Sequence, residues 1–222
     1  PDGPFSAQKD RLGGRDRHWW MRARLNVPEA GSGKQVALEL LTGLSGWNAT
    51  NPQMIVYLDG RMVQGIDVNH TEVLLEGGTT VDLLLYVYSS FNETKFDFSA
   101  KYKSIDLASE AMYYDLFVPF SSLDCFDAKS EIYLNSLKQL ELAANLLDLS
   151  RPKNEAYYAS ITAARGQLEK HFYKGLCGKG DAVVACIGHT HIDVAWLWPL
   201  RETVRKCART FSNVLALMDR YP

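Results

Sequence analysis

Residues 181–203 read DAVVACIGHTHIDVAWLWPLRET, and this stretch decides how the fold is interpreted. Its first part, residues 181–187, is almost wholly apolar, which is typical of a strand buried on both faces of a parallel sheet. Pro199 then suits the first turn of a helix. Beyond it, apolar residues recur at spacings of three and four, at Val204, Ala208, Phe211, Leu215 and Met218. The stretch therefore predicts the first βα unit of an α/β domain.

The loop between this strand and this helix carries the candidate chemistry. Ligands bind at the carboxyl ends of strands in open α/β sheets and βα-barrels, and His189, His191 and Asp193 lie there. Imidazole and carboxylate groups two residues apart can reach one metal ion. We therefore predict a metal site formed by His191 and Asp193, with His189 as a third candidate ligand. The indole of Trp196 suits a sugar ring, whereas Trp198, beside Pro199, is the better candidate for the core.

The motif His189-x-His191-x-Asp193-x-x-Trp196 resembles the first metal-binding motif of the class II α-mannosidases, glycoside hydrolase family 38. The continuation over residues 195–199 is most similar to the cytosolic and bacterial branch, because Golgi and lysosomal members tend to carry Asn-Asp-Pro-Gly-Trp instead. The resemblance implies that His191 and Asp193 bind Zn²⁺ and that Trp196 lies beneath the mannose of the −1 subsite. It also implies a retaining hydrolysis of terminal α-mannosyl residues of oligosaccharides, in the cytoplasm.

The same resemblance places the other functional residues later in the sequence. The family's aspartate nucleophile, its general acid and its remaining histidine ligand all follow this motif, so we expect the catalytic residues beyond residue 222. We therefore expect the chain to be the amino-terminal part of a longer enzyme, inactive by itself. Residues 181–222 alone should be loosely held, or ordered only against the helices that precede them.

Two other interpretations stay open. Metal-dependent amidohydrolases also place an H-x-H motif at the end of the first barrel strand, which would make His189 and His191 both ligands. The second alternative interpretation is a non-catalytic carbohydrate-binding module. It is suggested by polar and aromatic groups like those of a lectin site, in loops at residues 47–48, 51–53, 59–60 and 65–67. Asn, Asp and Gly in such loops mostly serve turn chemistry, so we favour packing on the catalytic domain as the role of this region.

The amino-terminal half shows the alternation of β-strands. Residues 1–14 are polar and rich in Gly and Pro, which predicts a flexible end. Residues 15–127 contain short runs of period two, including a hairpin at Asp59-Gly60 and a further strand over Met112–Val118. This spacing favours an antiparallel β-sandwich of jelly-roll type, acting as an accessory domain.

Near Ser130 the spacing of apolar residues changes from every second residue, as in a strand, to every third or fourth residue, as in a helix. Residues 128–178 carry two apolar helical stripes, Tyr133 to Leu147 and Tyr157 to Phe172, which predict an αα-hairpin linker. Residues 179–222 then begin a zinc-dependent, barrel-like α/β catalytic domain. The chain is therefore expected to be multidomain, with strands first, then helices, then a βα start.

The amino-acid composition narrows the classes of molecule that the protein is expected to bind. The formal charge is −2, which gives no electrostatic case for nucleic acid or membrane binding. No apolar run approaches the roughly 20 residues that a membrane helix needs. The four cysteines match no metal or redox spacing, which fits a reducing compartment. We expect a mannose-containing oligosaccharide as the partner, and assembly into a homo-oligomer stays open.

Overall fold

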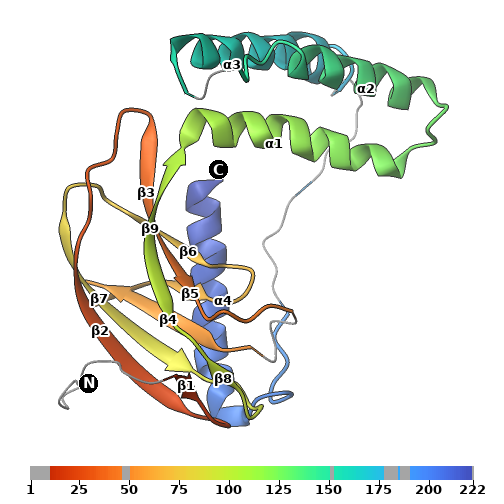
Figure 1. The fold of residues 1–222 in the computed structure, drawn as a ribbon. Helices are drawn as coiled ribbons and strands as arrows, with labels where there is room; N and C mark the ends of the chain where they lie inside the picture. Colours follow the sequence, from red (N-terminus) through yellow and green to blue (C-terminus); the bar gives the residue numbers. More distant parts are fainter. Residues whose placement is uncertain (1–10, 47–50, 151–152, 178–184, 186–190, 222) are drawn as a thin grey trace. The chain divides into compact units, whose positions relative to one another are not determined.

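A computed structural model describes residues 11–46, 51–150, 153–177, 185 and 191–221 (Figure 1). The chain divides into two compact units. The first contains Pro1–Ser104 and Cys186–Pro222, and the second contains Ile105–Ala185. Among the described helices, none combines the length and apolarity needed to cross a bilayer.

The first unit is built on two antiparallel sheets whose strands interleave along the sequence. The larger has the order β2-β7-β4-β5 and the smaller the order β6-β3-β9, while β1 pairs with β8. The larger sheet contains β2 (His18–Asn26), β7 (Thr80–Tyr88), β4 (Gln53–Leu58) and β5 (Arg61–Ile66). The others are β6 (Glu72–Leu75), β3 (Lys34–Leu41), β9 (Ser99–Asp106), β1 (Leu12–Gly13) and β8 (Lys95–Phe96).

Alternating side chains of these strands form one apolar core between the sheets. In β7 the inward residues Leu83, Leu85 and Val87 are at most 4% exposed. They pack with buried residues of the neighbouring strands, namely Val36, Leu38 and Leu40 of β3, Met54 and Val56 of β4, and Val73 and Leu75 of β6. Because a shift of one residue would turn this set toward solvent, the core fixes the register. The predicted β-sandwich is confirmed at this level.

The hairpin predicted at Asp59-Gly60 is also confirmed. Both residues have positive φ, 49° and 79°, as a tight hairpin turn between β4 and β5 requires. The Asp59 carboxylate accepts a hydrogen bond from the Asp82 backbone N–H at 2.9 Å. This aspartate therefore serves the turn.

The second unit is helical and has its own core. It contains α1 (Leu107–Ser122), α2 (Glu131–Ala144) and α3 (Glu155–Leu168), and α3 continues into a π-helical segment at Glu169–Tyr173. Buried side chains from all of these segments meet: Met112, Leu140, Ala143, Ile161, Ala164, Leu168 and Phe172. The two predicted helical stripes thus correspond to α2 and α3. The side chain that caps α3 is Asn154, which accepts a hydrogen bond from the Tyr157 backbone N–H.

The strand expected over Met112–Val118 is wrong, because these residues lie inside α1. Their near-continuous apolar run does not distinguish a strand from a helix. The start of the helix is set by Asp106, whose carboxylate accepts the Ser109 backbone N–H at 2.9 Å. Met112 then faces α2 and α3. Helical structure therefore begins well before residue 128.

A fourth helix, α4 (Leu200–Arg220), belongs to the first unit, where it lies against β5 and β4 (Figure 1). The expectation that only the preceding helices could order this segment is therefore wrong. The strand predicted at residues 181–187 falls outside the described residues except for Ala185, which is exposed and in no strand. The barrel-like βα unit accordingly stays a prediction.

The apolar stripe of α4, defined as Val204, Ala208, Phe211, Leu215 and Met218, is present but does not face the sheet. Val204 is 75% exposed and Leu215 is 62% exposed. The side of α4 that is buried is polar, and it includes Glu202, Thr203, Arg209, Ser212 and Asn213. The helix thus contacts the sandwich through the face that sequence periodicity would assign to solvent.

Asp106 provides a test of the second unit. Burial would raise the pKa of this carboxyl, but hydrogen bonds from Tyr158 and Ser109 and the charge of Lys153 outweigh it and hold the pKa at about 2. Because this lies below the unfolded value, the contribution to stability is complete above pH ~4 and is lost as the pH falls toward 2, amounting to about 2 kcal/mol. Asp106→Asn should lower the free energy of unfolding by about that amount at pH 7, measured by urea denaturation.

The control is Asp124→Asn, which changes an exposed carboxylate of the same unit. It should alter the free energy of unfolding by less than about 0.5 kcal/mol. An Asp106→Asn variant as stable as the parent at pH 7 would contradict the role given to this carboxylate.

Candidate metal and sugar site

The described part of the motif is an irregular loop that leads directly into α4. In it, His191 Nε2 and Asp193 Oδ1 lie 2.9 Å apart. The two side chains are 78% and 46% exposed, so both donor atoms are accessible from solvent. The structure therefore brings the two predicted ligands together, on a loop that an ion can reach.

The donor types fit zinc, which accepts imidazole nitrogen and carboxylate oxygen. They supply two ligands, whereas catalytic zinc sites take at least three from the protein. No cluster of three or more candidate ligands occurs among the residues that the structure describes. The third candidate, His189, lies outside them. His191 and Asp193 thus fit part of a zinc coordination sphere, and their role as ligands stays a prediction.

The loop is tied back to the first turn of α4. Ala195 has a positive φ of 61°, a conformation that costs energy for a residue with a Cβ atom. Its backbone N–H donates to the Thr203 hydroxyl at 3.3 Å. The Thr203 side chain is buried, being 8% exposed as a residue. The chain direction between Asp193 and α4 is therefore set by a contact to the helix itself.

The two tryptophans differ in their environment. Trp198 is 6% exposed and Trp196 is 51% exposed, and their rings meet edge to face at 5.8 Å. The Lys206 ammonium lies 4.1 Å from the centre of the Trp198 ring, a cation–π contact. Burial lowers the pKa of Lys206 and nearby Arg209 lowers it further, while the carboxylates of Asp67, Glu202 and Asp193 oppose this. Trp198 is thus a core residue, as expected, and the accessible indole is that of Trp196.

A buried ion pair beneath the loop escaped the sequence interpretation. Glu202 is fully buried, and its Oε1 accepts from Arg209 Nη1 at 2.8 Å. Arg205 approaches the other carboxylate oxygen at 3.5 Å and lies over the Tyr86 ring of β7. The signal that could have revealed it is a second helical period. Polar residues recur at positions 202, 205, 209 and 213, and we call Glu202, Arg205, Arg209 and Asn213 the polar stripe.

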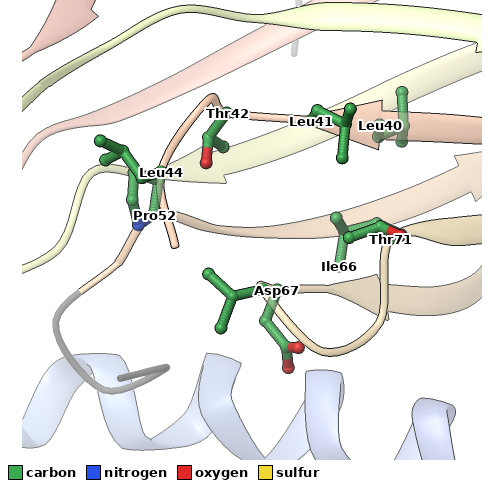
Figure 2. Close-up of a pocket in the computed structure, with 9 residues that line it drawn as sticks. Leu40, Leu41, Thr42, Leu44, Pro52, Ile66, Asp67 and Thr71 are labelled. Carbon is green, nitrogen blue, oxygen red and sulfur yellow. The ribbon is translucent and has the colours of Figure 1, made fainter. Parts of the chain in front are cut away.

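Some of the candidate loops of the sandwich border a small cavity. A cavity of about 90 Å³ lies between the end of β3 and the β5–β6 connection (Figure 2). It is lined mainly by apolar side chains, among them Leu40, Leu44 and Ile66. Ligand pockets usually measure about 300–1,000 Å³, so this cavity does not favour the carbohydrate-binding module. Of the other candidates, Trp47 and Asn48 lie outside the described residues, and Gln53 is buried.

Comparison with known proteins relates part of the chain to a family of glycoside hydrolases. Residues 181–222 match the family model described as Glycosyl hydrolases family 38 N-terminal domain. This segment contains the His191–Asp193 pair, Trp196 and all of α4. The match supports the resemblance to glycoside hydrolase family 38 that the sequence motif indicated.

Individual relatives extend the similarity. Alpha-mannosidase 2C1 of Mus musculus is 28% identical over 224 residues, which is 90% of this chain and 20% of that protein. Alpha-mannosidase 2C1 of Homo sapiens is 47% identical over 55 residues, 25% of this chain and 5% of the relative. Alpha-mannosidase of Saccharomyces cerevisiae is 58% identical over 36 residues, 16% of this chain and 3% of the relative. The chain therefore spans about a fifth of the length of the mouse protein.

The contrast between the two tryptophans predicts a contrast in stability. Trp198→Ala removes a buried indole and should lower the free energy of unfolding by about 3 kcal/mol or more. Trp196→Ala changes a ring that is half exposed and should cost less than about 1 kcal/mol. Chemical denaturation followed by circular dichroism measures both. Equal losses in the two variants would mean that the rings are buried alike.

Proposed function

We propose that the protein containing this chain is a retaining, zinc-dependent α-mannosidase that removes terminal α-mannosyl residues from oligosaccharides. The observation that supports this most directly is the convergence of His191 and Asp193 in the loop that also carries the accessible Trp196 indole. All three residues lie in the segment that matches the family 38 domain. The same match favours this reaction over amidohydrolase chemistry.

The chemistry of an α-mannoside explains why a metal would help. Its axial 2-hydroxyl crowds the anomeric carbon, and zinc, when bound, would hold the sugar hydroxyls and favour distortion of the ring. His191 and Asp193 would each contribute one donor atom to that ion. Asp193 would thus act as a metal ligand, and we assign the role of nucleophile to an aspartate later in the family's sequence.

Trp196 would form the floor of the sugar subsite. An indole presents a large flat apolar face, which matches the apolar face of a pyranose ring. Its edge-to-face contact with the buried Trp198 ring holds it at the start of α4. Trp196→Ala should therefore raise the KM for an oligosaccharide, with a smaller relative change in zinc content.

We place the enzyme in the cytoplasm, on the similarity of residues 195–199 to the cytosolic branch. The described cysteines Cys125, Cys177 and Cys207 are all free, as expected in a reducing compartment. A mannose-containing oligosaccharide would be the substrate.

The metal assignment predicts the effect of removing either ligand. His191→Ala and Asp193→Ala in the full-length protein should each lower zinc content and reduce hydrolysis of an aryl α-mannoside by more than about 100-fold, because an incomplete coordination sphere binds the ion weakly. Elemental analysis and a chromogenic assay measure the two effects.

The matched controls are His171→Ala and Asp124→Ala, which change exposed residues of the helical unit. Both should leave zinc content and activity unchanged. Near-native zinc content and activity in Asp193→Ala would exclude this carboxylate as a ligand.

A further inference from the structure

The surface beneath the metal motif is an uncommon helix–sheet interface. Helix α4 lies against β5 and β4 through its polar stripe, while its apolar stripe stays exposed. Glu202 and Arg209, the central pair of the polar stripe, are 0% and 4% exposed. Charged groups removed from water need partners, and Glu202 and Arg209 partner one another within α4, so this face of the helix can be buried against the sheet.

The closest approach of helix and sheet is at Gly65 in β5. A Cβ atom at this glycine would lie 2.8 Å from Arg209 Cβ and 3.0 Å from both its Cα and its carbonyl oxygen. Carbon atoms do not approach so closely, so any larger residue would push the helix away. The backbone of α4 therefore rests directly on the backbone of β5.

A hydrogen bond fixes the position of the helix along the strand. The Gly65 backbone N–H donates to Asn213 Oδ1 at 2.8 Å, and the contact is buried. Because β5 is an edge strand, its outward N–H groups have no strand partner there. Asn213 supplies the missing acceptor, and a slide of the helix by one residue would break the bond.

The same helix holds the motif at its other end. Thr203, next to Glu202, accepts the Ala195 backbone N–H in the loop that carries Asp193. Arg201, at the start of α4, forms an ion pair with Asp16, which precedes β2. The buried Trp198, just before α4, packs against the Lys206 side chain of the helix. The loop is thus attached to a helix whose position the sandwich sets.

We propose that β5 of the sandwich positions the metal ligands, with Gly65, Asn213 and the Glu202–Arg209 pair as positioning residues for His191 and Asp193. This proposal rests on the zinc site proposed above. It gives the accessory sandwich a specific task, which is to hold α4 at one register and so hold the two donor atoms at a fixed place. None of the positioning residues contacts substrate or metal.

Zinc affinity of the full-length protein tests the proposal. Gly65 lies about 130 residues before the ligands in the sequence, so Gly65→Ala leaves the ligands themselves intact. The substitution should nevertheless raise the dissociation constant for zinc at least tenfold, measured by competition with a chromophoric chelator. Asn213→Ala, which removes only the side-chain acceptor, should change it in the same direction. The control Gly31→Ala adds a methyl group at ordinary contact distance in the same unit and should have no effect.

Coupling separates positioning from simple destabilisation. In an Asp193→Ala background, Gly65→Ala and Asn213→Ala should cause a smaller loss of zinc affinity than in the parent protein, because only His191 is left for them to position. Circular dichroism at the titration temperature verifies that each variant is folded. If Gly65→Ala does not fold, the zinc affinity of Asn213→Ala tests the positioning role by itself.

The outcomes distinguish this proposal from the proposed function. Native zinc affinity in Gly65→Ala and Asn213→Ala, with weakened affinity in Asp193→Ala, would overturn positioning by β5 and leave the zinc site standing. Native affinity in Asp193→Ala would overturn the zinc site, and this proposal with it. Weaker zinc affinity in Gly65→Ala, Asn213→Ala and Asp193→Ala supports both proposals when the loss in the double variants is smaller than the sum of the single losses.

Discussion

The buried ion pair between Glu202 and Arg209 is the interaction on which the arrangement of the metal motif depends. Removing two opposite charges from water is costly, and their attraction offsets that cost only when the geometry is good. The 2.8 Å contact between them meets that condition. Removing either partner would leave an unpaired buried charge, at a cost of about 3–5 kcal/mol. Because both residues lie on α4, the pair allows this charged face of the helix to be buried against the sandwich.

The edge of the larger sheet gives this orientation its place in the fold. An uncovered edge strand presents unpaired backbone groups that can pair with other chains, and proteins often cover such edges. Here α4 covers β5 and supplies an acceptor to Gly65. The helix therefore completes the sandwich with polar groups and leaves its apolar stripe exposed, at Val204, Phe211, Leu215 and Met218.

The sequence could predict the parts of the structure that depend on local pattern. Period-two runs located the strands of the sandwich, Asp59-Gly60 located the hairpin, and the motif identified His191 and Asp193, which the structure brings within 2.9 Å. The apolar run at Met112–Val118 misled, because helix and strand are alike over so short a stretch. The N-cap residue Asp106 was the signal that could have corrected it.

The burial of the polar stripe could not be predicted from periodicity. A hydrophobic stripe predicts which face of a helix avoids water, but the polar Asn213 is buried because it accepts a hydrogen bond from a strand residue 148 positions away. Such partners become visible only when the fold brings the two segments together. The motif at the start of the helix therefore indicated a candidate site, whereas the contact surface of the helix could not be predicted.

The central claim is that the polar stripe of α4 rests on β5 at a fixed register. Hydrogen exchange of the Gly65 amide measures this directly, because an edge-strand N–H exchanges slowly only when it is bonded and buried. We predict strong protection of the Gly65 amide in the parent protein, and its loss in Asn213→Ala while amides of β7 stay protected. Rapid exchange at Gly65 in the parent protein, with β7 protected, would contradict the account.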